Sequence, residues 1–182
     1  MDELIDILNA DGEPLGTTAI KSEAHKKGLF HATVHIWFYT EDGKILLQKR
    51  ALTKETHPSL WDVSVAGHIG AGESIVNSAI REIQEEIGLP VKGTELQKIG
   101  VFKSIQKHSE QLFDCEFHHT FLVKLKVCLE NLTKQQSEVD DLKLISINQF
   151  ENELYNKELA KQYVPHSKKY YTKILKEIKQ LL

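Results

Sequence analysis

The sequence of 182 residues is poor in cysteine, proline and arginine. Two cysteines, Cys115 and Cys128, are too few for the disulfide framework of a small secreted domain, so their number favours a reducing compartment. Four prolines stand singly, and no linker-like tract or internal repeat interrupts the chain. Because a chain of this length can bury a sizeable core, we expect one domain over residues 1–182.

The chain also lacks a surplus of charge and a long apolar run. Lys and Arg together number 23 and Asp and Glu 26, which gives a formal net charge of −3. Domains that bind a nucleic acid polymer usually carry a basic surplus, so this class of partner is excluded. No apolar run approaches the ~18 residues of a membrane span, and the acidic first residues differ from a basic signal peptide. We therefore expect a cytoplasmic protein that does not enter a membrane.

The hydrophobic pattern predicts several strands. Extended segments are expected on both sides of turns at residues 9–12 and 41–43, because β-branched and aromatic residues flank these Asp-Gly dipeptides. Two further strands are expected at 95–105 and 114–129, the second long and well alternated. Strands mixed with a few helices indicate an α/β sandwich with one sheet.

Two segments carry the periodicity of amphipathic helices. From Ser74 to Ile87 apolar residues recur at three- and four-residue steps, and Gly88 followed by Pro90 ends the pattern. A C-terminal helix is expected at about 167–182. We expect this helix to pack on the sheet, and two further roles stay open for the C-terminal segment: it forms one wall of a pocket, or it forms the face of a homodimer.

The segment from Gly67 to Leu89 gathers four glutamates on and before the first helix. At about 100° per residue, Glu82, Glu85 and Glu86 fall within roughly one 100° sector. A solvated acidic face is the ordinary explanation of such a helix, although like charges at this spacing cost a few tenths of a kcal/mol per pair. Here, however, a glycine-rich loop with Glu73 at its edge precedes the helix. Mg²⁺ typically binds a few converging carboxylates together with the phosphates of a substrate. The pattern therefore indicates metal-assisted phosphate chemistry.

Written out, this segment resembles a complete Nudix box. Gly67, five residues, Glu73, seven residues and then REIQEEIGL over 81–89 fill the pattern Gx5Ex7REUxEExGU, in which U is aliphatic. A solvated acidic face does not explain agreement at nine fixed positions. The resemblance implies the Nudix fold, an α/β/α sandwich with a mixed β-sheet between helices, and hydrolysis of a nucleoside diphosphate linked to another group.

The resemblance also implies roles for individual residues. It implies one set of ligands for Mg²⁺ or Mn²⁺: Glu82, Glu85, Glu86, the backbone carbonyl of Ala66, and Glu116. Glu73 is expected to pair with Arg81 and to hold the loop on the helix. The metal would neutralise phosphate charge and lower the pKa of the attacking water. The catalytic base stays open between Glu82 and Glu86, with Glu116 as the next candidate.

Outside the box, the stretch from about Lys21 to Phe121 resembles the isopentenyl-diphosphate isomerase branch of the superfamily. In that branch a lysine four residues before a histidine, then an arginine and a lysine after the third strand, hold the substrate's diphosphate. Lys21, Arg50 and Lys54 occupy these places here. Trp61 is a candidate wall of the substrate pocket, with packing in the core as the alternative.

The same branch binds a divalent metal through three histidines and two acidic residues. The corresponding positions are His25, His31, His68, Asp114 and Glu116. His25 and His31 stand one residue closer together than in the isomerases, and Asp114 replaces the usual glutamate. A second metal site with imidazole ligands would suit Zn, Mn or Fe better than Mg. Strand parity places Glu116 and Cys115 on opposite faces, and it also separates Cys115 from Cys128, so no disulfide is expected.

One departure from the isomerases bears on function. These enzymes need a cysteine immediately before the Gly-His pair for proton exchange, and this chain has Ala66 there. We therefore expect a Mg²⁺-dependent hydrolase of a small diphosphate. Two alternatives stay open: an isomerase with another proton donor, and a non-catalytic diphosphate-binding protein. Substrate specificity is expected from loops at 103–112 and 137–142.

Overall fold

The computed structural model describes residues 2–182. The helices and strands follow in the order β1 (Leu4–Leu8), β2 (Pro14–Ile20), α1 (Lys21–Lys27), β3 (Phe30–Tyr39), β4 (Lys44–Arg50), β5 (Trp61–Asp62), β6 (Val65–His68), α2 (Ile75–Ile87), β7 (Gln97–Ser109), β8 (Leu112–Lys124), β9 (Val139–Ser146), α3 (Ile147–Tyr155) and α4 (Lys168–Leu181). Short 3-10 turns lie at Gly93–Glu95, Leu129–Asn131 and Leu159–Gln162. None of the helices within residues 2–182 has the length and apolarity that a membrane crossing requires.

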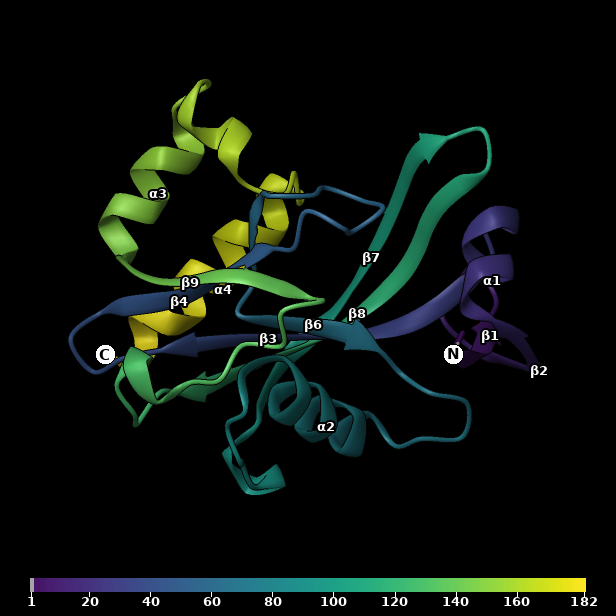
Figure 1. The fold of residues 1–182 in the computed structure, drawn as a ribbon, viewed down its shortest axis with the longest axis horizontal. Coiled ribbons are helices and arrows are strands. Elements are labelled where there is room, and N and C mark those ends of the chain that lie inside the picture. The colour runs from purple at the N-terminus through teal and green to yellow at the C-terminus, as the bar shows by residue number, and fades with distance from the viewer. Residues whose placement is uncertain (1) are drawn as a thin grey trace.

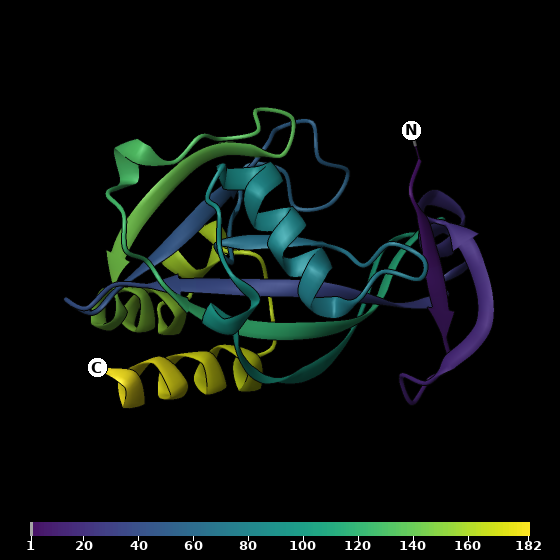
Figure 2. The same cartoon turned by 90° about the horizontal axis from the view of Figure 1, so that it is seen from below.

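Strand β3 lies at the centre of a mixed, nine-stranded sheet. It pairs antiparallel with β1, β4 and β6 and parallel with β8, where nine residue pairs stand in register. Helix α2 covers one face of the sheet and α4 the other, so the molecule is an α/β/α sandwich (Figures 1 and 2). The expected fold class is confirmed.

The alternation of β3 divides the interior into two parts. Val34, Ile36 and Phe38 are fully buried in the core beneath α2. On the opposite face, Trp37 joins the aromatic core beneath α4. The residues of β3 that precede Trp37 on this second face are polar, with His35 among them, and they are buried as well. One end of this face is therefore polar inside the protein, which is unusual and marks the region of the candidate site.

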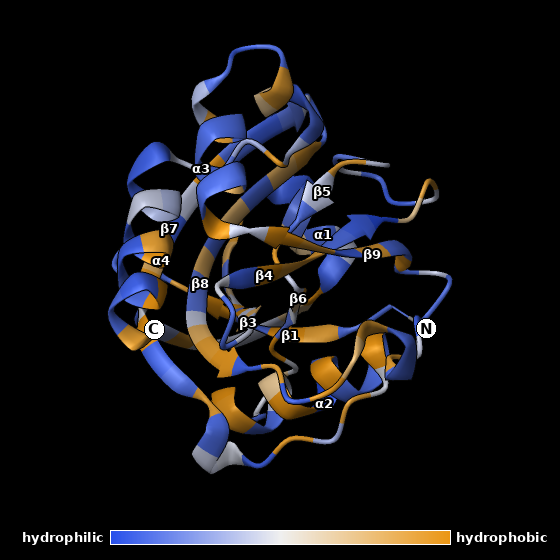
Figure 3. Cartoon of the chain, turned by 90° about the vertical axis from the view of Figure 1, so that its left-hand side faces the viewer, coloured by the Kyte–Doolittle hydropathy of each residue, from blue (hydrophilic) through white to orange (hydrophobic). Residues whose placement is uncertain are grey.

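Helix α2 begins and ends at the residues that the sequence predicts. The hydroxyl of Ser74 accepts a hydrogen bond from the backbone N–H of Asn77, 3.2 Å away, which caps the N-terminus. Gly88 ends the helix with φ of 66°, a left-handed conformation that favours glycine. Apolar residues of α2 and α4 lie on one side of each helix and polar residues on the other (Figure 3). Both predicted helices are confirmed.

The loops expected at 103–112 and 137–142 are largely strands. β7 continues to Ser109 and pairs with β8 almost to the turn, while β9 begins at Val139 and pairs with β4. These segments form strands in spite of their polar composition, because strand pairing satisfies the backbone hydrogen bonds whichever side chains the strands carry. Helices α1 and α3 are not predicted by the sequence pattern. α1 has seven residues and buries only Ala24, so it carries no helical hydrophobic period.

The buried histidines of this face generate a prediction about acid stability. Burial lowers the pKa of His118 from 6.5 to about 4 and lowers that of His35 well below its usual range. The unfolded chain therefore binds protons that the folded chain does not, so the free energy of unfolding falls as the pH drops below about 6.5.

We expect each such histidine to contribute a slope of up to about 1.4 kcal/mol per pH unit, measured by urea unfolding between about pH 7 and about pH 5. His35→Asn should make this slope shallower than in the wild type. An unchanged slope would contradict the account.

Candidate active site

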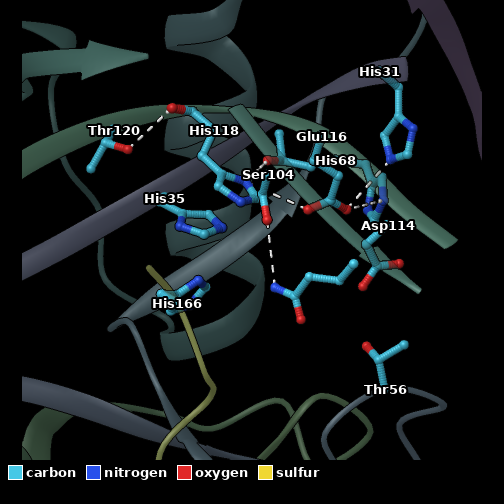
Figure 4. Close-up of polar contacts among 12 residues, drawn as sticks. His31, His35, Thr56, His68, Ser104, Asp114, Glu116, His118, Thr120 and His166 are labelled. Atoms are coloured by element: carbon cyan, nitrogen blue, oxygen red, sulfur yellow. Dashed lines mark hydrogen bonds and ion pairs between the residues drawn. The ribbon is translucent and has the colours of Figure 1, made fainter. Parts of the chain in front are cut away.

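A cluster of histidines and a glutamate lies on the polar face of the sheet. One ligand atom from each of His25, His31, His68 and Glu116 lies within 4.8 Å of all the others. The side chains come from α1, β3, β6 and β8, and the parallel pairing of β3 with β8 sets His31 directly opposite Glu116. Glu116 Oε1 lies 3.4 Å from His31 Nε2 and 3.6 Å from His68 Nε2 (Figure 4).

This histidine cluster has the chemistry of a metal site. The Nε2 atom of His31 is buried without a hydrogen-bond partner, which is costly unless something binds it. Burial and the nearby Lys21 ammonium lower the pKa of His68 well below its usual range, so its imidazole is neutral, as a ligand must be. Burial would raise the pKa of Glu116, but the His31 imidazole beside it lowers it. A neutral imidazole beside an ionised carboxylate fits a divalent transition metal.

The structure differs from the sequence-based expectation at Asp114. Its carboxylate does not belong to the group of converging ligand atoms but lies behind it, 2.8 Å from His25 Nδ1 and 2.7 Å from His108 Nε2. A carboxylate on the far nitrogen orients an imidazole and fixes its tautomer. The side chain of Asp114 is one methylene group shorter than that of the glutamate usual at this position, and in this arrangement it positions His25.

The box glutamates Glu82, Glu85 and Glu86 belong to α2, which lies on the other side of β6. Glu82 and Glu86 are 8% and 4% exposed, which rules out a solvated acidic face, whereas Glu85 is half exposed. Burial raises the pKa of Glu82 to about 7 and raises that of Glu86 well above its usual range. Two buried carboxylates side by side repel each other, and a bound cation is what would hold both of them ionised.

Arg81 is the cation that contacts Glu82 and Glu85. Its guanidinium lies 3.0 Å from Glu73 Oε2, the contact that the box resemblance implies, and 2.7 Å from Glu82 Oε1. It also donates a hydrogen bond of 3.0 Å to the backbone carbonyl of His68. Arg81 thus ties the glycine-rich loop, the helix and the strand of the histidine cluster together.

Strand β6 separates the two groups of ligands. The His68 side chain joins the histidine cluster, whereas Gly67 has no side chain on the other face, where Glu82 lies against it. The backbone N–H of Ala66 donates a hydrogen bond of 3.3 Å to Glu86 Oε2, so the Ala66 backbone lies beside a box carboxylate through its N–H group. Gln48 on β4 donates to the same oxygen at 3.1 Å.

The basic residues expected to hold a diphosphate are distributed unevenly. The positive charges of Lys21 and Lys54 both act on His68, and that of Lys54 also acts on Glu86, so Lys54 is close to both groups of ligands. Arg50 is already engaged, since its guanidinium lies 3.2 Å from Asp62 Oδ2 and donates to the carbonyl of Thr56. Trp61 is half-buried under the ammonium of Lys143, 4.1 Å from the ring centre.

Two features of this region are missed by the sequence reasoning. Glu138 pairs with Lys54 and its charge acts on Glu86, which places a further carboxylate at the edge of the box site. Asp62 and His166 form a buried pair on the opposite face, 104 positions apart in the chain. The only signal in the sequence for the Asp62–His166 pair is the number of histidines. Tertiary packing brings these two distant residues together.

Comparisons of the sequence and the fold with known proteins show what this chain is similar to. The family model described as the NUDIX domain matches residues 29–167. An uncharacterised Nudix hydrolase of Clostridium acetobutylicum is 38% identical over 159 residues, covering 86% of this chain and 76% of the relative. An isopentenyl-diphosphate Delta-isomerase of Serratia proteamaculans is 34% identical over 122 residues, covering 67% of this chain and 66% of the relative. A crystal structure of DR0079 from Deinococcus radiodurans shares the fold with a TM-score of 0.65 at 16% identity, covering 81% of this chain and 86% of that one.

The close approach of Glu82 to Gly67 generates a prediction. A Cβ added at Gly67 would lie 2.0 Å from Glu82 Cδ, so Gly67→Ala forces this carboxylate out of its position. We expect affinity for Mn²⁺, measured by titration calorimetry, to fall about 10–100-fold, while the far end of a flexible side chain absorbs the clash and the fold survives.

Gly93→Ala is the matched control, because its added Cβ meets a Val76 methyl group at 3.0 Å, away from β6. Wild-type Mn²⁺ affinity in Gly67→Ala, with the fold intact, would show that Glu82 is not a ligand.

Proposed function

Because the chain belongs to the Nudix family, we propose that it is a divalent-metal-dependent hydrolase that cleaves the diphosphate linkage of a small nucleoside-diphosphate-type or related substrate. The observation that carries the proposal is the buried pair Glu82 and Glu86 beside the backbone of Ala66. Burying two carboxylates this closely is expensive unless a cation joins them. A structural role alone would not offset this cost.

Different residues of the chain would bind the phosphates, hold the metal and accept a proton. The positive charges of Lys21 and Lys54 act on His68, and that of Lys54 also acts on Glu86, so these two lysines attract the phosphates. A bound Mg²⁺ or Mn²⁺, held by Glu82, Glu85 and Glu86, would neutralise phosphate charge and lower the pKa of the attacking water. Glu82 and Glu86 are our candidates for the general base, because both are buried on the side of α2 that faces β6. Arg81 keeps the Glu82 carboxylate oriented.

Removing the negative charge of one box carboxylate tests this proposal. Glu86→Gln keeps the shape of the side chain, and burial already disfavours the charge at this position, so the variant should fold. We expect it to lose about 10²–10⁴-fold in Mg²⁺-dependent release of phosphate or pyrophosphate. The assay uses nucleoside di- and triphosphates, nucleotide sugars and isopentenyl diphosphate. Glu177→Gln, on the surface of α4, is the matched control. Full activity of Glu86→Gln would overturn the ligand assignment.

A second candidate function is isopentenyl-diphosphate isomerisation. The observation that favours it is the histidine cluster, which the box chemistry does not require, together with the resemblance to the isomerase branch. The observation against it is Ala66, whose methyl group cannot exchange a proton with an allylic carbon.

We expect no deuterium to enter isopentenyl diphosphate when the protein is incubated in D₂O with Mn²⁺ or Zn²⁺. Elemental analysis of the same sample shows whether metal is bound, and His31→Gln should remove metal from the histidine cluster alone. Exchange above the background rate would establish the second function in place of the first.

A further inference from the structure

His108 is a histidine that belongs neither to the box nor to the histidine cluster. It lies near the end of β7, where the register with β8 shifts between Lys107 and Ser109, so His108 is the extra residue of a β-bulge. Bulges re-aim the side chains at the point where they occur. At this bulge the His108 imidazole reaches across to β8, and its Nε2 lies 2.7 Å from Asp114 Oδ2.

Both oxygens of the Asp114 carboxylate are engaged by imidazoles. Oδ1 lies 2.8 Å from His25 Nδ1, and Oδ2 is the oxygen that His108 contacts. The side chains of His25, Asp114 and His108 are only 12%, 14% and 15% exposed, so water and salt screen these contacts little. In Figure 4 the Asp114 carboxylate points away from Glu116. Asp114 is thus held outside the histidine cluster by both of its oxygens.

Asp114 decides which nitrogen of His25 faces the histidine cluster. A carboxylate oxygen accepts hydrogen bonds, so the Nδ1 atom of His25 donates to it. An imidazole that binds a metal is neutral, and its donating Nδ1 then carries the only ring proton. Nε2 is left with the lone pair that a metal needs, and it lies 3.1 Å from His68 Nε2, inside the cluster.

The ring of His108 is itself held from a second segment, the loop between β4 and β5. The ring of His57 packs edge-on against it, with the ring centres 5.0 Å apart and an angle of 77° between the planes. His57 Nε2 lies 3.0 Å from Gln106 Oε1, and Gln106 stands opposite Asp114 on the β7–β8 ribbon. His57 has a φ of 49°, a left-handed conformation that is costly for a residue other than glycine and persists where the surroundings hold it.

From these contacts we propose that His108 is a positioning residue of the histidine cluster: through Asp114 it fixes His25 with Nε2 toward the metal, and it keeps the Asp114 carboxylate out of the ligand set. The protein ligands are then His25, His31, His68 and Glu116. Three imidazoles and one carboxylate suit Zn²⁺ better than Mg²⁺. The inference goes beyond the proposed function, because it concerns the histidine cluster and not the box glutamates.

A purely structural role for His108 is the alternative, in which its contact with Asp114 only joins the bulge of β7 to β8. The two roles predict different behaviour of substitutions at this residue. Positioning requires a hydrogen-bond donor at Asp114 Oδ2, and its loss is felt by a metal at His25. A structural role would be met by any side chain that keeps the ribbon folded, and it would leave the ligands of a bound metal unchanged.

The experiment titrates Co²⁺ into the full chain and records its visible absorption bands, which report the kind and number of the ligands. An excess of Mg²⁺ fills the oxygen ligands of the box, and His31→Gln, which removes a ligand of the cluster, gives the background. His108→Phe keeps a ring of similar size without the donor. We expect it to bind Co²⁺ about 10–100-fold more weakly than the wild type, with shifted bands, because the contact that orients His25 is lost.

His108→Gln carries an amide N–H in place of the imidazole N–H, and we expect it to restore most of the affinity and the wild-type bands. His119→Phe, on the opposite face of β8 from Glu116, is the matched control and should leave both unchanged. If His108→Phe does not fold, Asp114→Asn takes its place. Its amide has a single acceptor oxygen for two imidazoles, so the same loss is expected.

Four outcomes would overturn the proposal. They are wild-type affinity and bands in the folded variant that lacks the donor or the second acceptor, an equal loss in His108→Gln, the same loss in His119→Phe, and absence of Co²⁺ from the cluster of the wild type. Hydrolysis by the box is measured separately, and its failure would leave the result for His108 unchanged.

Discussion

The guanidinium of Arg81 connects the segments that carry the box glutamates and the histidine cluster. It is shared among Glu73 on the loop, Glu82 on the helix and the backbone carbonyl of His68 on β6. Without this cation the buried carboxylate of Glu82 would have the like charges of Glu85 and Glu3 beside it, and the loop would lose its ion pair with the helix. Because β6 also carries the His68 imidazole, the same contact sets the distance between the box carboxylates and the histidine cluster on the other face.

The face of the sheet beneath α4 is graded from polar to apolar along its strands. The parallel pairing of β3 with β8 brings His31 beside Glu116 at one end, and two residues further along each strand it brings Thr33 beside His118. Beyond them Trp37 enters the aromatic core. Its indole N–H and the Nδ1 of His35 both meet the hydroxyl of Tyr170, which closes the polar region with satisfied hydrogen bonds. The Nε2 atom of His118, buried without a hydrogen-bond partner, lies in this region between the candidate metal ligands and the core.

The sequence predicted those parts of the site that local spacing determines. The helix bounds, the burial of one helix face and the alternation of β8 follow from the periods of helix and strand. The partners of Arg50, the place of Asp114 behind His25 and the pair Asp62–His166 could not be predicted in this way. Each depends on side chains from distant segments, and a single sequence contains no signal for their distance. The resemblance supplied the members of the histidine cluster, but only the register of β3 with β8 explains why they converge.

Residue 66 separates the two chemistries that this architecture can hold. The Ala66 side chain packs against the core beneath α4, beside the polar face, where a proton-transferring group would have to stand. Its backbone, in contrast, serves the box, because its N–H donates to the buried carboxylate of Glu86. A methyl group supplies no proton, whereas the backbone function does not depend on the side chain. Residue 66 thus offers the box a backbone hydrogen bond but has no side chain that could transfer a proton, even though His68 of the histidine cluster lies two residues further along β6.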